Sequence, residues 1–102
     1  MATDLDVRQQ QLSVTTTSSK VADMTMPSNR RKVLYFRNTS PNAADIITIA
    51  LSSNAPAVDD VGIVLKQNDQ YVETTSEGFE AWQGQVNAIC KTANGKLTVL
   101  ER

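Results

Sequence analysis

From residue 30 to residue 40 the chain reads Arg-Arg-Lys-Val-Leu-Tyr-Phe-Arg-Asn-Thr-Ser, its densest apolar run, with a basic entry and a polar exit. Apolar side chains occupy both parities of this run, so both faces of a strand would be apolar. The two faces would carry Val33 with Tyr35 and Leu34 with Phe36. Strands with two apolar faces are typical of the middle of a covered sheet. The run therefore predicts a central strand over residues 31–38.

Short alternating segments and turn residues continue on both sides of this run. Residues 46–52 alternate and place Ile47, Ile49 and Leu51 on one core-facing side. Tight turns are expected at 66–69 and at Asn94-Gly95, and each predicts a hairpin between the flanking strands. The expected strands are 12–15, 21–26, 31–38, 46–52, 62–65, 70–75, 85–91 and 96–102, and a further segment at 79–83 precedes a kink or turn at Gly84.

This spacing, with no convincing helix between the strands, predicts an all-β fold. The chain has 102 residues, which is the size of one domain. We expect a small antiparallel β-sandwich or barrel of about six to eight strands over residues 30–102. An extended N-terminal arm with possible edge strands would occupy residues 1–29.

The N-terminal arm is polar, lacks aromatic residues and has widely spaced apolar ones. A short helix over residues 4–11 is one interpretation of its start, and β-prone alternation begins at Leu12. The arm is either an unstructured tail or a segment that orders against a neighbouring subunit, for instance by adding a strand to an exposed sheet edge.

Charge and composition argue against several classes of protein. The formal net charge is −1, whereas general nucleic-acid binders are usually basic, so no nucleic-acid partner is expected. No secretory signal and no apolar run of membrane-spanning length is visible, so we expect synthesis in a cytoplasm and no membrane partner. The single cysteine, Cys90, cannot form an intrachain disulfide and is interpreted as a buried thiol.

The sequence carries no catalytic signature. Histidine is absent, which removes histidine-based nucleophile systems and the usual zinc sites. Glycines are isolated, so no phosphate-binding loop is present. The acidic residues Glu73, Glu77 and Glu80, and likewise Asp59, Asp60 and Asp69, are interpreted as solvated or turn positions. We expect no enzyme activity, no cofactor and no metal.

Two groups of residues suggest binding instead. The basic entry of the central strand could contact a partner surface or discourage edge pairing. Tyr71, Phe79 and Trp82 suggest a sugar platform, although aromatic residues are also needed to fill the core. The candidate partner-binding residues are Leu5, Val7, Leu12, Val14, Arg30, Arg31, Lys32 and Trp82.

Over residues 30–102 the chain also resembles a known class of proteins. The resemblance is carried by Arg-Lys-Val-Leu-Tyr-Phe-Arg-Asn-Thr-Ser-Pro from residue 31, Ile-Thr-Ile-Ala-Leu from 47, Gly-Ile-Val-Leu-Lys from 62, Gln-Tyr-Val-Glu from 70 and Leu-Thr-Val-Leu-Glu-Arg from 97. This pattern resembles small β-rich virion proteins of tailed phages, most closely capsid decoration, or cement, proteins. The chain departs from their pattern with Asn68-Asp69, where glycine is common.

The resemblance implies a structural protein on the outer surface of a phage head, which stabilises the head by bridging capsid subunits. Its implied partners are the major capsid protein and further copies of the chain, as a homotrimer or another homo-oligomer. A neck, tail or head-fibre structural protein is an alternative. A carbohydrate-binding β module of a virion adhesion component is another.

Overall fold

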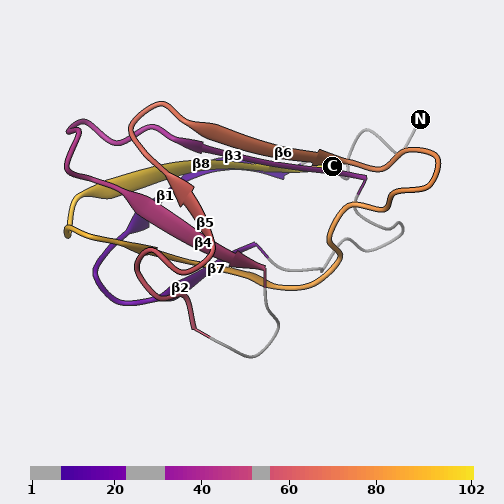
Figure 1. Cartoon of the computed structure of the whole chain (residues 1–102). Helices are drawn as coiled ribbons and strands as arrows, with labels where there is room; N and C mark the ends of the chain where they lie inside the picture. The colour runs from indigo at the N-terminus through magenta and orange to yellow at the C-terminus, as the bar shows by residue number, and fades with distance from the viewer. Residues whose placement is uncertain (1–7, 23–31, 52–55) are drawn as a thin grey trace.

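The computed structural model describes residues 8–22, 32–51 and 56–102, and within them it contains eight β-strands and no helix (Figure 1). The expected all-β fold is confirmed. No helix among the described residues is long and apolar enough to span a membrane. The strands are β1 (Arg8–Val14), β2 (Ser19–Ala22), β3 (Val33–Asn38), β4 (Ile47–Leu51), β5 (Ile63–Leu65), β6 (Gln70–Thr74), β7 (Val86–Cys90) and β8 (Gly95–Glu101).

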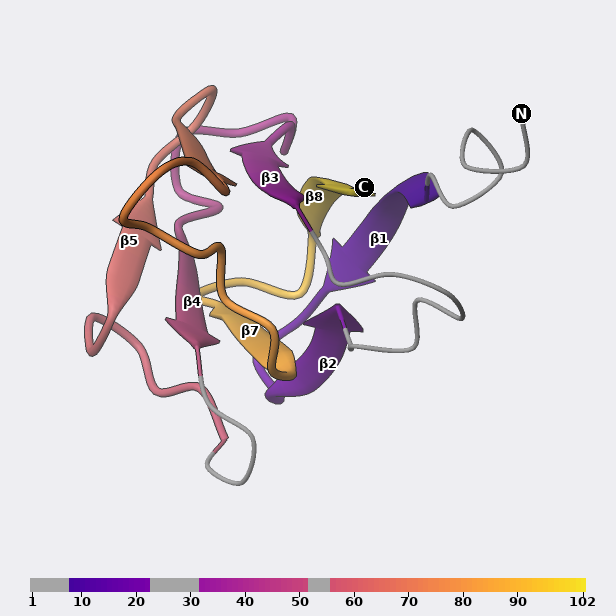
Figure 2. The ribbon, with the colours of Figure 1, turned by 90° about the vertical axis from the view of Figure 1, so that its right-hand side faces the viewer.

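The strands form two four-stranded antiparallel sheets, in the orders β1-β8-β3-β6 and β2-β7-β4-β5. Seen from its end, the molecule is a sandwich of these two sheets (Figure 2). Four of the pairings are nested, namely β1 with β8, β2 with β7, β3 with β6 and β4 with β5. The chain is therefore one long hairpin of four strand pairs, rolled up so that successive pairs lie in alternate sheets. This topology is that of an eight-stranded jelly roll.

The jelly-roll winding corrects both expected hairpins. The turn at 66–69 is present, with Asn68 at φ +68°, but it joins β5 to β6, which lie in different sheets. The Asn94-Gly95 turn likewise joins β7 to β8 across the sandwich. A two-residue hairpin of this type requires positive φ at both central residues, and neither Asn94 nor Gly95 has it. Glycine is needed here for packing, because a Cβ atom at Gly95 would lie 2.6 Å from the carbonyl oxygen of Val14.

β3 is a central strand, as expected, and lies between β8 and β6. Its inward side chains Leu34 and Phe36 are fully buried, but Val33 and Tyr35 on the other face are only half-buried. The expectation that both faces are covered is therefore wrong for this strand. Each sheet of a two-layer sandwich has a single inner face, so the second apolar face of β3 lies on the outside of the molecule.

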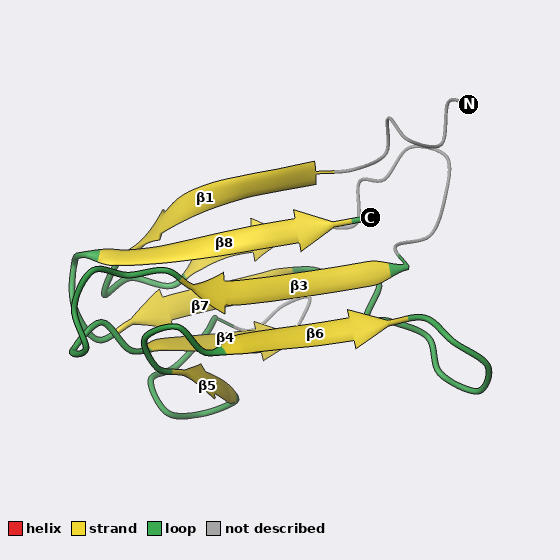
Figure 3. Cartoon of the chain, turned by 90° about the horizontal axis from the view of Figure 1, so that it is seen from above, coloured by secondary structure: helices red, strands yellow, loops and turns green. Residues whose placement is uncertain are grey.

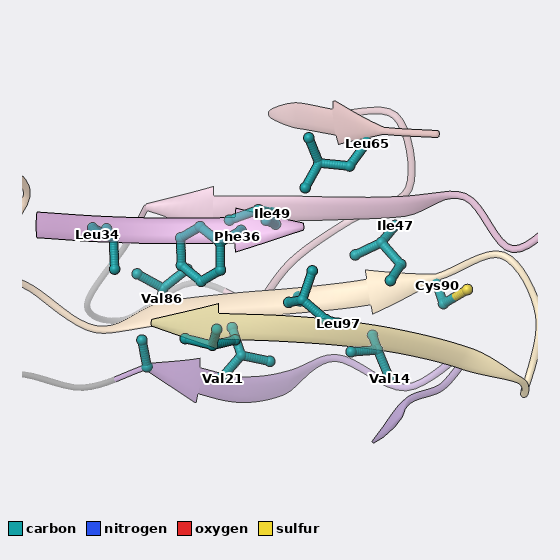
Figure 4. Packing of buried hydrophobic residues seen from close by; sticks show 13 residues of the cluster. Val14, Val21, Leu34, Phe36, Ile47, Ile49, Leu65, Val86, Cys90 and Leu97 are labelled. Atoms are coloured by element: carbon teal, nitrogen blue, oxygen red, sulfur yellow. The ribbon is translucent and has the colours of Figure 1, made fainter. Parts of the chain in front are cut away.

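The core lies between the two sheets and consists of apolar side chains from the inner faces of both (Figure 4). In β4, Ile47 and Ile49 are fully buried and Leu51 packs against the cluster, so the predicted core side of this strand is confirmed. The buried cluster consists of Val14, Val21, Ala22, Leu34, Phe36, Ile47, Ile49, Leu65, Val86, Ala88, Cys90, Leu97 and Val99.

The N-terminal segment contributes two edge strands to this sandwich. β1 pairs with β8 and β2 with β7 of the same chain, and Val14 and Val21 lie in the core. A helix over residues 4–11 is wrong for 8–11, which are strand, because the pattern around Leu12 and Val14 repeats every two residues. Residues 1–7 and 23–31 lie outside the described residues. The predictions for the start of a helix at 4–7, for most of the strand at 21–26 and for the basic pair Arg30-Arg31 therefore stay predictions.

A buried polar cluster closes the sandwich at the end of β3. The Asn38 side chain is fully buried, and its Nδ2 donates to the carbonyl oxygens of Asp45 at 2.8 Å and Leu65 at 2.9 Å. Its Oδ1 accepts from the Ser40 N–H at 3.0 Å. The Asp45 carboxylate in turn accepts from the Thr92 hydroxyl. Asn38 thus joins the end of β3 to the β4 entry and to the end of β5 with every side-chain hydrogen-bonding atom paired.

Candidate interaction surface

The outer side of the β1-β8-β3-β6 sheet carries an apolar row across three strands. The register places Tyr35 of β3 directly opposite Leu100 of β8 and Val72 of β6. Tyr35 and Leu100 are half-buried and Val72 is 46% exposed. Val33 lies two residues before Tyr35 on the same side of β3 and extends the row. A continuous apolar row on the outside of a sheet is typical of a surface that another molecule covers.

The charged residues around this row are all basic. Arg37 follows Tyr35 on the outer side of β3, and Lys96 lies outward on β8, where its ammonium donates to Ser13 Oγ at 2.9 Å. Arg102 exchanges backbone hydrogen bonds with Val33, which places it on the same side. The outward positions of the four strands hold no carboxylate. We call this surface the basic face and define it by Val33, Tyr35, Arg37, Val72, Lys96, Leu100 and Arg102.

The β6–β7 connection presents a second apolar feature, the exposed ring of Phe79. Ser76 and Phe79 exchange backbone hydrogen bonds, each 2.9 Å long, and close a tight turn over Glu77 and Gly78. Gly78 has φ +82°, a left-handed conformation that favours glycine. Phe79 is 50% exposed. We call residues 75–80 the Phe79 hairpin.

Glu73 of β6 and Thr75, the first residue of the hairpin, fix its base. Glu73 points inward, and its Oε1 accepts from the Trp82 N–H at 2.8 Å while Oε2 accepts from the Tyr71 hydroxyl. Thr75 Oγ1 accepts from the Ala81 N–H at 3.0 Å, and the Thr75 N–H donates to the Lys32 carbonyl oxygen at 2.7 Å. The hairpin is therefore anchored on both sides and holds Phe79 in a defined position.

Trp82 helps to hold the chain where it turns into β7. Its Nε1 donates to the Gln85 carbonyl oxygen at 3.0 Å, and its ring packs against the core. A Cβ atom at Gly84 would lie 2.5 Å from the ring, so glycine is needed to let the chain pass over the indole. The structure thus gives Trp82 a packing role and leaves Phe79 as the exposed aromatic residue of this connection.

The Tyr71–Glu73 pair allows a test in alkaline solution. Partial burial, together with the hydrogen bond and negative charge of Glu73, raises the pKa of Tyr71 to about 12 from 10.0. Because the folded pKa is the higher one, the stabilisation is fully present below pH 10 and is lost as the pH rises toward 12. We expect Tyr71→Phe to flatten the fall in unfolding free energy over this interval and to remove one high-pH phenolate transition from an ultraviolet titration. Tyr35→Phe is the control; if it removes that transition and Tyr71→Phe does not, the assignment is wrong.

The outer side of the other sheet carries exposed valines. The loop before β5 lies over this sheet, because the Asp60 N–H donates to Thr48 Oγ1 at 3.0 Å and the otherwise outward Thr48 is fully buried. Val58 and Val61 form an antiparallel bridge around a turn and are 53% and 64% exposed. Val64 of β5 is 38% exposed on the same side. We call Val58, Val61 and Val64 the valine patch.

Those predicted partner-binding residues that the structure describes do not share one surface. Val14 is fully buried and Leu12 packs against the same core, so both serve intrachain packing. Lys32 is exposed at the entry of β3. Leu5, Val7, Arg30 and Arg31 lie outside the described residues. The sequence did not predict the basic face. Its one sign in the sequence was that Val33 and Tyr35, which alternate with the core residues of β3, are also apolar.

The acidic and cysteine side chains that the structure describes are dispersed or paired within turns and ion pairs. Within residues 8–22, 32–51 and 56–102, no three acidic or cysteine side chains are grouped as metal ligands. Asp60 pairs with Lys91 at 2.8 Å, and Asp69 Oδ2 accepts from the Lys66 N–H at 3.0 Å within its own turn. Cys90 is a buried free thiol.

Comparison with known proteins adds no relative on which a role could be based. A scan against protein-family models and searches of curated proteins and of solved structures found no match to the chain.

Proposed function

We propose that the chain is a non-catalytic structural protein of a tailed-phage virion, which sits on the outer surface of the head and stabilises it by bridging subunits. One observation carries the bridging role: apolar surfaces lie on the outer sides of both sheets, as the basic face and the valine patch. A bridging protein needs two contact surfaces that can be occupied at once. The phage assignment rests on the sequence resemblance over residues 30–102.

The fold is compatible with this role without determining it. Jelly rolls occur in viral capsid proteins and in lectins, and a fold alone does not imply a function. The proposed partners are the major capsid protein and further copies of the chain. We assign the capsid contact to the valine patch, because the opposite sheet carries the features that suit self-contact.

No specific observation favours the carbohydrate-binding alternative. A sugar platform requires several aromatic rings on one exposed face, and the three candidate residues do not provide it. Trp82 packs against the core and against Gly84. Tyr71 is half-buried with its hydroxyl on Glu73, and Phe79 is exposed. If the protein bound glycans on an array and Trp82→Ala abolished that binding, the alternative would replace the present proposal.

Co-sedimentation with empty heads of the phage that encodes the chain tests the proposal. We expect the full chain to pellet with heads and to raise the temperature at which they disrupt. The double variant Val58→Ser and Val61→Ser should weaken head binding about tenfold or more, because it removes the favourable burial of two apolar side chains in the contact.

Ala93→Ser is the matched control, since it also replaces an exposed apolar side chain by a hydroxyl, at the β7–β8 turn. It should leave head binding unchanged. A wild-type protein that neither pellets with heads nor protects them from heat contradicts the proposal. Equal losses in the two variants contradict the assignment to the valine patch.

A further inference from the structure

The Phe79 hairpin has the form of a docking element. Burying a phenylalanine side chain is clearly favourable relative to leaving it exposed to water. Phe79 nevertheless stays 50% exposed, on a turn held by two backbone hydrogen bonds and anchored through Glu73 and Thr75. A rigid exposed aromatic residue loses little conformational entropy on binding, and such residues are common anchors of protein interfaces.

The charges around Phe79 identify the surface that it fits. Glu77 and Glu80 flank Phe79 in the sequence, and both are exposed. The hairpin is therefore apolar at its centre and acidic at its sides. The basic face has the complementary composition, with an apolar row across Tyr35 and basic residues such as Arg37 around it. The two surfaces match in both charge and apolar character.

The position of the hairpin favours a contact with a second molecule over one within the same molecule. Seen from above the basic face, the β6–β7 connection extends past the end of β6, beyond the sheet (Figure 3). Docking of one basic face on another, the symmetric alternative, would bring Arg37 and Lys96 of both molecules together without a carboxylate between them. Charge complementarity thus favours the hairpin of a second copy as the occupant.

We propose that copies of this chain associate head to tail, with the Phe79 hairpin of one copy docked on the basic face of the next. Each copy offers one hairpin and one face, so the contact is heterologous and builds a closed ring or an open chain. The inference supplies the self-contact of the bridging protein proposed above, but it does not depend on head binding and leaves the valine patch accessible.

Sedimentation velocity of the full chain over a range of concentrations tests the proposal. The wild type should form oligomers as concentration rises, and the association should weaken between about 0.05 M and about 0.5 M salt, because the charges are screened. Phe79→Ser and Arg37→Glu should each weaken association about tenfold or more. Both positions are exposed, so circular dichroism should show an unchanged fold.

Two control variants match these changes elsewhere. Lys66→Glu repeats the charge change of Arg37→Glu at an exposed turn position, and Val61→Ser removes an exposed apolar side chain from the loop before β5, on the opposite sheet's side. Neither should alter self-association. A monomeric wild type at all concentrations, or controls as damaging as Phe79→Ser, would overturn the proposal.

Mixing the two defective variants separates a heterologous contact from a symmetric one. Phe79→Ser retains an intact face and Arg37→Glu retains an intact hairpin, so an equimolar mixture should form heterodimers and no larger species. A symmetric interface predicts no recovery, and monomers in the mixture would therefore overturn the proposal. If the wild type is monomeric but Phe79→Ser loses head binding, the hairpin contacts the capsid, which overturns the self-contact and leaves the proposed function standing.

Discussion

Phe36→Ala is expected to lower the free energy of unfolding by about 3–5 kcal/mol, which is the usual cost of truncating a buried aromatic residue. The Phe36 side chain is fully buried and is the largest in the core, where it lies among the aliphatic side chains of both sheets (Figure 4). Truncation would remove apolar contacts and leave a cavity that β-strands paired on both sides cannot easily close. Since domains of this size have about 5–15 kcal/mol of stability, the loss would be a large share of the total.

Urea unfolding monitored by circular dichroism measures this effect. Phe36→Leu should cost clearly less, because it retains most of the buried apolar volume. Phe79→Ala is the matched control, since the same chemical change at a half-exposed position should alter stability by no more than about 0.5 kcal/mol. Similar losses at Phe36 and Phe79 would contradict the description of the core.

The sequence was sufficient to predict the class of fold and most strand positions. Period-two alternation is a local property, so the strand at Ile47–Leu51 and its core side could be read directly. The pairing of strands is not local. Both hairpin predictions were wrong because a turn residue such as Asn68 determines only the local reversal of the chain. It does not determine which sheet the next strand joins. The jelly-roll order depends on the long-range pairs β1 with β8 and β2 with β7.

The candidate surface was less predictable for a related reason. The sequence showed that both faces of β3 are apolar. A second apolar face can lie under another layer or on the outside of the molecule, and only the number of layers in the fold decides which. The same ambiguity made Leu12 and Val14 look like exposed arm residues. The spacing of Phe79 and Trp82 could not tell which ring is exposed. Their positions depend on contacts that the spacing does not show, since the Trp82 backbone is held by Glu73 and the Phe79 backbone by Ser76.

The largest effect of a polar substitution is expected at Asn38, which the sequence marked only as part of a strand exit. Asn38→Ala would leave the carbonyl oxygens of Asp45 and Leu65 without this donor in a buried site. Losing such partners should lower the free energy of unfolding by about 2–4 kcal/mol. Asn42→Ala is the control, because Asn42 is exposed and its hydrogen bonds with Asp45 use its backbone N–H and carbonyl oxygen, so its cost should stay within about 0.5 kcal/mol.

Asn38→Asp sharpens the test because it keeps the shape and removes the donor. At neutral pH the new carboxylate would face two carbonyl oxygens, so this variant should be less stable than Asn38→Ala. Burial raises the pKa of the new carboxyl group above its unfolded value, and the folded state then binds the extra proton more tightly. The stability of Asn38→Asp relative to wild type should therefore recover as the pH falls below neutrality, whereas that of Asn38→Ala should not, as urea unfolding at several pH values would measure. If the two variants had the same pH dependence, the side chain at position 38 would not be donating to these carbonyl groups.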